Sequence, residues 1–180
     1  MRKFLLLAIV LSCSAAMNGR LFAATPEKPN LLFIHFPGPD SVGHAKGWGS
    51  PEQLAIIEQV DADIGMLLNA LRTSGLESST IVIISADHGG SGKQHGANDE
   101  RSLHIPWIIS GPGIRKNYDL TQARELTIRT TDTFVTACYI LGIDLPDGTE
   151  GKPIVQAFEK PGELMRDVKP TATTSPSARQ

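Results

Sequence analysis

Cysteine is scarce in this sequence, long hydrophobic runs are missing, and neither sign of charge is in clear excess. Only Cys13 and Cys138 occur among 180 residues, so at most one disulfide could form within the chain. The N-terminal apolar run, residues 4–11, is well short of the roughly 20 residues that a membrane-spanning helix needs. With 17 basic and 19 acidic residues, the formal net charge is −2. Bulk charge therefore favours neither nucleic acid nor an anionic membrane surface as a partner.

The N-terminus has the three parts of a secretory signal peptide. Arg2 and Lys3 precede the apolar run, and small residues follow it as far as Ala24. We therefore predict that residues 1–24 are a cleaved signal peptide and that the protein is exported, to the periplasm or the extracellular space. A lipoprotein signal through Cys13 is a weaker alternative, because the residues before it form a poor lipidation box. A buried N-terminal helix is a second alternative.

Cleavage of this segment would change both the charge and the cysteine content. Three basic residues and no acidic residue would leave, so the formal net charge would change from −2 to −5. Cys13 would leave as well, and Cys138 alone could form no disulfide within the chain. Cys138 lies in an apolar helical pattern, which predicts a small buried thiol. The fold would then depend on its core, on metal or on a partner.

Apolar runs and helical periodicity alternate along the chain. Residues 31–36 and 80–84 are nearly continuous hydrophobic runs, as strands covered on both faces require. Between them, Ser50 and Pro51 are typical of a helix start, and apolar residues then recur at helical spacing until Gly75. The pattern predicts a β-α-β unit with a right-handed crossover.

The rest of the chain predicts one more strand, one more helix and a tail. Residues 105–110 form the third strand, and residues 130–141 form a helix that ends at Gly142. Residues 161–180 are rich in Pro, Ser and Thr and predict a disordered tail. We therefore expect an α/β fold, a mostly parallel sheet with flanking helices, over residues 25–160.

Metal-compatible side chains follow two of the predicted strands. Asp40 and His44 come after the first strand, Asp87 and His88 come directly after the second, and His95 lies in the same glycine-rich loop. Ligands in open α/β sheets gather outside the carboxyl ends of the strands. Carboxylate oxygen and neutral imidazole are ligands that zinc accepts readily. The alternative for each single residue is a helix cap or a solvated surface histidine, and His35 and His104 are interpreted as packing or surface residues.

Four segments in this order, PDSVGH, SADHGGSGKQHG, IPWIISGPGI and TDTFVTACYILGI, resemble the second half of the catalytic domain in the alkaline phosphatase superfamily. The similarity is greatest to the type I phosphodiesterase/nucleotide pyrophosphatase family, with sulfatases more distant. It runs from about Lys28 to Ile154. The resemblance implies two zinc ions beside a threonine or serine nucleophile. It assigns one metal to Asp40, His44 and His95, and a second to Asp87 and His88.

The sequence departs from that family at its start. In the family, an earlier strand carries a further metal aspartate, and the nucleophile follows it. Nothing between the predicted signal peptide and Leu31 supplies either, and the hydroxyls of Ser85 and Ser91 do not stand in the family's nucleophile context. The first metal site is therefore expected to be complete, the second half missing, and the catalytic nucleophile absent.

Two functions follow from these observations. The first is a secreted zinc-dependent phosphodiesterase or phosphatase-type hydrolase of phosphoester substrates, truncated and catalytically impaired; another divalent metal could replace zinc. The second is a non-catalytic exported module that binds metal or a partner. A sheet that lacks a neighbouring strand also predicts self-association through its exposed edge.

Overall fold

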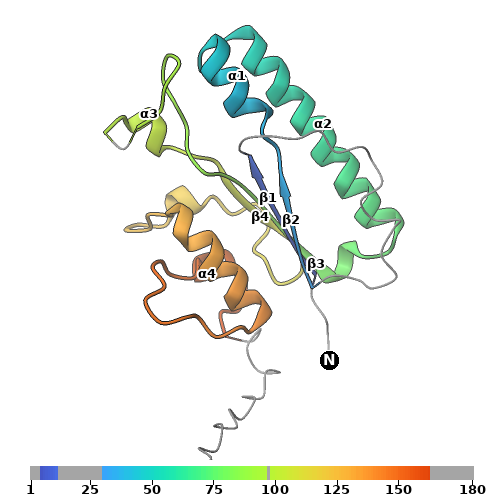
Figure 1. Cartoon of the computed structure of the whole chain (residues 1–180). Helices are drawn as coiled ribbons and strands as arrows, with labels where there is room; N and C mark the ends of the chain where they lie inside the picture. The colour runs from blue at the N-terminus through green and yellow to red at the C-terminus, as the bar shows by residue number, and fades with distance from the viewer. Residues whose placement is uncertain (1–4, 12–29, 97, 163–180) are drawn as a thin grey trace, which may run out of the picture.

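The computed structural model describes residues 30–96 and 98–162 and, for residues 5–11, the course of the backbone. The elements are shown in Figure 1 and follow in the order β1 (Leu5–Leu11), β2 (Leu31–His35), α1 (Gly38–Lys46), α2 (Pro51–Thr73), β3 (Thr80–Ala86), α3 (Glu100–Leu103), β4 (Trp107–Ser110) and α4 (Thr130–Leu141). Short 3-10 turns lie at Glu77–Ser79, Leu120–Gln122 and Val155–Ala157.

The four strands form one mixed sheet in the order β2-β1-β3-β4. β1 is parallel to both β2 and β3, whereas β4 is antiparallel to β3. The predicted α/β class is confirmed. β4 reverses direction because the chain between β3 and β4 holds only the four-residue helix α3 and does not cross back over the sheet, as a parallel connection would require.

Part of the predicted signal peptide forms a strand inside this sheet. Residues 5–11 lie as β1 between β2 and β3, so they are extended and not the buried helix considered as an alternative. Cleavage after residue 24 stays a prediction, since the structure is that of the whole chain. The rest of residues 1–24, and the predicted tail from residue 163 onward, lie outside the described residues.

Helices α2 and α4 cover opposite faces of the sheet (Figure 1). Successive side chains of β3 point to opposite faces, so this strand packs against both helices. On one face, Val82 of β3 and Ile34 of β2 pack with Leu71 of α2. On the other face, Ile81 and Ile83 pack with residues of α4 and of the C-terminal segment, namely Ala137, Ile140, Ile154 and Phe158. No helix of the described part of the chain has both the length and the apolar character needed to cross a bilayer.

The strongly patterned helices lie where the sequence predicts them. At the start of α2, the Ser50 hydroxyl accepts a hydrogen bond from the Gln53 N–H at 3.2 Å, and Gly75 follows the helix with a φ of 70°. α4 has the predicted bounds, and Gly142 ends it in the left-handed conformation. Cys138 is buried, as predicted, and desolvation raises the pKa of its thiol.

The structure also contains a helix that the sequence analysis did not predict. Residues Gly38–Lys46 form α1 directly after β2. Pro37 and Pro39 indicated only the end of a strand, yet Pro39 lies in the first turn of the helix. A proline is tolerated there because the backbone N–H groups of that turn have no partner within the helix. α1 is the element that carries the first two candidate ligands.

Candidate metal centre

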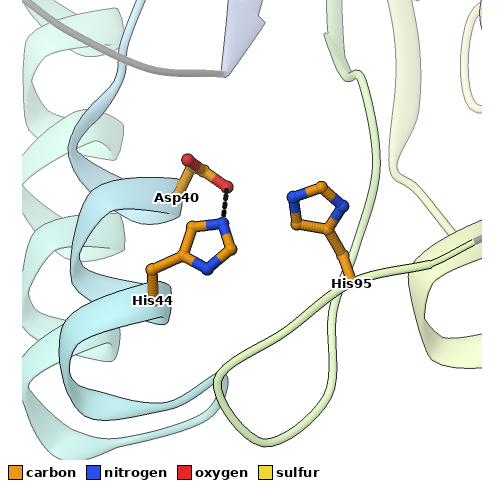
Figure 2. Close-up of side chains that lie close together, drawn as sticks. All are labelled: Asp40, His44 and His95. Atoms are coloured by element: carbon orange, nitrogen blue, oxygen red, sulfur yellow. Dashed lines mark ion pairs between the residues drawn. The ribbon is translucent and has the colours of Figure 1, made fainter.

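Helix α1 places Asp40 and His44 on one face, because residues four apart in an α-helix are neighbours. The Oδ1 atom of Asp40 lies 3.5 Å from Nε2 of His44, and Figure 2 shows both side chains directed toward the loop that carries His95. The spacing D-x-x-x-H thus places both candidate ligands on the same side of α1.

Buried Gln53 fixes the start of α1 against the start of α2. Its Nε2 donates to the carbonyl of Pro39 at 2.9 Å, and its Oε1 accepts from the N–H of Gly49 at 2.6 Å. The side chain is only 4% exposed. Since an unmade hydrogen bond at a buried amide is costly, this side chain holds the ligand-bearing helix in one position.

The loop after β3 supplies the other candidate ligands, and α3 holds it in place. The N–H of Gly89 donates to the carbonyl of Ser102 at 2.8 Å, and the N–H of Gly96 donates to the Ser102 hydroxyl at 3.1 Å. A Cβ at Gly89 would lie 2.0 Å from the carbonyl oxygen of Arg101, so only glycine allows this approach. The loop therefore returns His95 to the point where β3 ends.

Asp40, His44 and His95 come together in this way. One potential ligand atom from each lies within 4.8 Å of the others. Ligand atoms around a tetrahedral zinc ion with bonds of 2.0–2.2 Å are about 3.4 Å apart. The Asp40–His44 contact, at 3.5 Å, already has this length, and the other separations would have to shorten from at most 4.8 Å to complete a three-residue set.

His88 lies against the same cluster. Its Nε2 is 3.8 Å from Oδ1 of Asp40 and 3.6 Å from Oδ2 of Asp87, and its ring stacks on that of His95 with centroids 3.8 Å apart. The backbone N–H of His88 also donates to Oδ1 of Asp87 at 3.1 Å. The structure thus brings all five predicted ligands into one region, with His88 between the two predicted sets.

Two histidines are oriented by main-chain carbonyls. Nδ1 of His44 lies 3.0 Å from the carbonyl oxygen of Lys93, and Nδ1 of His88 lies 2.9 Å from that of Gly89. A carbonyl oxygen can only accept, so each Nδ1 carries the proton. In the neutral rings the two Nε2 atoms then carry lone pairs, which is the state in which imidazole binds a metal.

One oxygen of the carboxylate that these Nε2 atoms face has no hydrogen bond. Oδ1 of Asp40 is buried and has no hydrogen-bond partner among the described residues. Its two imidazole neighbours, at 3.5 and 3.8 Å, are too distant or poorly aligned to donate to it. A buried carboxylate oxygen that faces two imidazole lone pairs is stabilised by a cation placed between them. These residues therefore fit a divalent metal ion.

Trp48 is a site residue that sequence reasoning missed. Its ring meets those of His44 and His95 edge-on, with centroids 4.9 and 5.9 Å away, and its backbone N–H donates to the carbonyl of Gly92 at 2.7 Å. A Cβ at Gly90 would lie 2.2 Å from the indole. Trp48 thus joins α1 to the loop, and the Gly-Trp-Gly stretch after D-x-x-x-H was the available signal.

The remaining candidates have ordinary surroundings. Ser85 is 2% exposed and its hydroxyl donates to the carbonyl of Ala86 at 3.1 Å. His35 is half-buried and stacks on Phe33, whereas His104 is exposed at the end of α3. Outside the cluster, the carboxyl of Asp119 has a lowered pKa because the Thr121 hydroxyl donates to it. None of these groups contributes to the metal cluster.

The family model described as Type I phosphodiesterase / nucleotide pyrophosphatase matches residues 7–107, which include all five candidate ligands. An ulvan-active sulfatase of Formosa agariphila is 33% identical over 111 residues, which are 56% of this chain and 21% of that protein. Arylsulfatase K of Bos taurus is 35% identical over 102 residues, 54% of this chain and 18% of that protein. An uncharacterized pyrophosphatase/phosphodiesterase of Schizosaccharomyces pombe is 40% identical over 63 residues, 35% of this chain and 13% of that protein. The chain thus spans about a fifth or less of the length of these curated relatives.

Proposed function

Because this chain belongs to the type I phosphodiesterase / nucleotide pyrophosphatase family, within the alkaline phosphatase superfamily, we propose that it is the metal-binding portion of a phosphoester hydrolase. Asp40, His44 and His95 hold one zinc ion or another divalent metal, and Asp87 with His88 contribute to a second, incomplete site. The mixed sheet corresponds to part of a larger, mostly parallel, alkaline-phosphatase-like sheet. The protein acts after export, with a phosphoester small molecule as its substrate.

The observation that carries this proposal is the buried oxygen of Asp40 that has no hydrogen-bond donor. A carboxylate oxygen that is buried, lacks a donor and faces the lone pairs of His44 and His88 is costly in the metal-free protein. Outer hydrogen bonds that orient ligating histidines are typical of metal centres, and both rings have one. The missing hydrogen bond destabilises the metal-free protein, and a cation bound at this oxygen would remove that destabilisation.

When bound, such a metal ion polarises a phosphoryl oxygen and neutralises charge that develops on it. The chain's own residues hold the ligands at fixed positions. α1 presents Asp40 and His44 together, the carbonyl of Lys93 fixes the ring of His44, and Trp48 keeps the His95 loop against α1. Binding and orientation of a phosphoester are therefore the roles that these residues can fulfil.

Catalysis is proposed to be impaired because, among the residues that the structure describes, neither Ser85 nor Ser91 stands in the sequence context of the family's nucleophile. Ser85 is buried and its hydroxyl is bonded to the main chain. Ser91 lies in the turn that pairs with Gln94, before His95, and is the hydroxyl to test first if activity is found. A non-catalytic exported metal-binding or interaction module is the second candidate, because the cluster of ligands can hold a metal whether or not a nucleophile accompanies it.

Metal analysis tests the proposed site directly. The purified chain, dialysed against zinc, should retain about one tightly bound zinc ion, as three protein ligands with one open position allow. His95→Ala should lose this ion, with a weakening far beyond the 10–100-fold that loss of an outer hydrogen bond costs. His104→Ala is the matched control, because that side chain is exposed and is not part of the Asp40, His44 and His95 group. An unchanged zinc content in His95→Ala would refute the ligand assignment.

Hydrolysis of a chromogenic phosphodiester separates the two candidate functions. The impaired hydrolase should give slow turnover that a chelator abolishes and that Asp40→Ala also abolishes. Removal of a nucleophile from a hydrolase leaves about 10³–10⁴-fold acceleration over water, and an incomplete second site should leave less. Zinc binding without any turnover would favour the non-catalytic module. Turnover on the order of 1–10³ per second would show that a nucleophile is present.

A further inference from the structure

β1 fills a space in the sheet that fits one strand. It is parallel to β2 over five residue pairs and parallel to β3 over seven, whereas β2 and β3 do not pair with each other. Neighbouring strands lie about 4.8 Å apart, so removal of β1 would leave a slot of about 10 Å between β2 and β3. Two strands at that distance cannot hydrogen-bond to each other.

The slot lies within the buried part of the sheet. Ile81 and Ile83 of β3 are 0% and 1% exposed, and Ile34 of β2 is 5% exposed. The cluster beneath α2 contains Ile34 from one side of the slot and Val82 from the other. Loss of β1 would therefore open a gap below α2 and leave buried backbone N–H and C=O groups of both flanking strands unpaired.

The strand that fills the slot is the one that a signal peptidase would remove. Residues 5–11 are the hydrophobic centre of the predicted signal peptide, and the same continuous apolar character suits a central strand. This segment can therefore either remain in the sheet or be removed with the signal peptide, but not both. In an uncleaved chain it completes the sheet, and in a chain that begins at Thr25 it is absent.

We propose that the space between β2 and β3 is a binding site for one parallel apolar strand, and that its occupant is the segment Leu5–Leu11 of this chain. A chain that lacks its first 24 residues should take this segment back as a separate peptide. Main-chain hydrogen bonds to both flanking strands would supply the binding, as in other cases of strand addition. The peptide should bind in the register of β1, in which Leu6 pairs with Leu31 of β2 and with Ile81 of β3.

The test compares residues 25–180 with the full chain, both in chelator so that metal plays no part. The shortened chain should melt at a lower temperature and exchange the amide hydrogens of β2 and β3 faster. A peptide of residues 5–11 flanked by lysines for solubility should reverse both changes. At a peptide concentration 100-fold above its Kd, the Tm should rise by about 5–10 °C. The same peptide with Ala8→Pro is the control, since proline removes a ladder N–H and does not fit a central strand.

A second route keeps the proposal testable if the shortened chain is insoluble. A protease site inserted after Ala24 allows cleavage of the folded full chain. The released segment should then stay bound through gel filtration and leave only when the protein unfolds. Release of the segment with unchanged Tm and unchanged exchange of β3 would overturn the proposal, and so would equal rescue by the proline peptide. These outcomes are independent of zinc, so they stand or fall separately from the proposed function.

Discussion

Asp40→Asn should change the stability of the protein in opposite directions with and without metal. In chelator, the substitution removes a buried carboxylate oxygen that has no donor and replaces it with an amide that can donate to the lone pair of His44 or His88. An unsatisfied buried group costs about 1–3 kcal/mol. We expect the metal-free variant to be about 1 kcal/mol more stable than the wild type, which is about 2–4 °C in Tm for a chain of this size.

With zinc the order should reverse. A ligand at 100 times its Kd stabilises the native state by about 2.7 kcal/mol, so wild-type Tm should rise by about 5–11 °C. The variant lacks the anionic ligand and should gain little. Thermal unfolding followed by circular dichroism, with chelator and then with zinc, measures all four values. Asp61→Asn is the control, because that residue is exposed on α2 and should leave both values unchanged.

Two results would refute this reasoning. A lower Tm for Asp40→Asn in chelator would mean that its carboxylate is well satisfied in the metal-free protein. A zinc-dependent rise in the variant equal to that of the wild type would mean that the ion binds elsewhere. The first result bears on the unpaired oxygen and the second on the ligand set, so the two causes can be told apart.

Three further substitutions test the packing around the site and the fold. Gly90→Ala should lower the free energy of unfolding by about 1–3 kcal/mol and weaken zinc binding, because the new Cβ would lie 2.2 Å from the ring of Trp48. Gly96→Ala is the control, since a Cβ there would have no atom within 4 Å. Equal zinc affinities of the two variants would contradict the reasoning. Gly65→Ala places a methyl group in open space within α2 and should raise the free energy of unfolding, measured with denaturant, by about 0.5–1 kcal/mol. A lower free energy of unfolding would mean that the methyl group disturbs a contact. Asp132→Ala should lower the free energy of unfolding by about 2–4 kcal/mol, because this buried side chain accepts hydrogen bonds from two backbone N–H groups at 2.8 Å. A change under 1 kcal/mol would show that water replaces these two hydrogen bonds.

Local signals were sufficient for most of the elements. α2 and α4 combine helical periodicity with defined ends, and β3 contains an uninterrupted apolar run at residues 81–84, so each could be located from the sequence. α1 was missed because proline and glycine dominate its start and its apolar pattern is weak. The place of residues 5–11 could not be decided from composition, since a signal peptide and a central strand both require an unbroken apolar segment.

The candidate site was predictable as a set of residues but not as a geometry. Asp40 and His44 are four apart in the sequence, and His95 follows β3 in a glycine-rich loop. The orientation of the histidine rings depends on the carbonyls of Lys93 and Gly89, which local sequence does not place. Nor could sequence show that Trp48 packs between α1 and the loop. Such contacts depend on tertiary packing between segments far apart in the chain.

The positions of the ligands along the chain have a consequence for the unfolded state. His44 and His95 belong to segments that α2 and β3 separate, so an ion bound by both would cross-link the chain across about 50 residues. By the relation used for disulfides, a covalent link at these two positions would lower the entropy of the unfolded chain by an amount that is worth up to about 4 kcal/mol in free energy at room temperature. A chain with so few cysteines would obtain from a metal ion, through binding to the folded state alone, a stabilisation of the size that disulfides give to small domains. Unlike a disulfide, the ion would leave the chain on unfolding, so chelation would withdraw binding free energy from the folded state and leave the freedom of the unfolded chain unchanged.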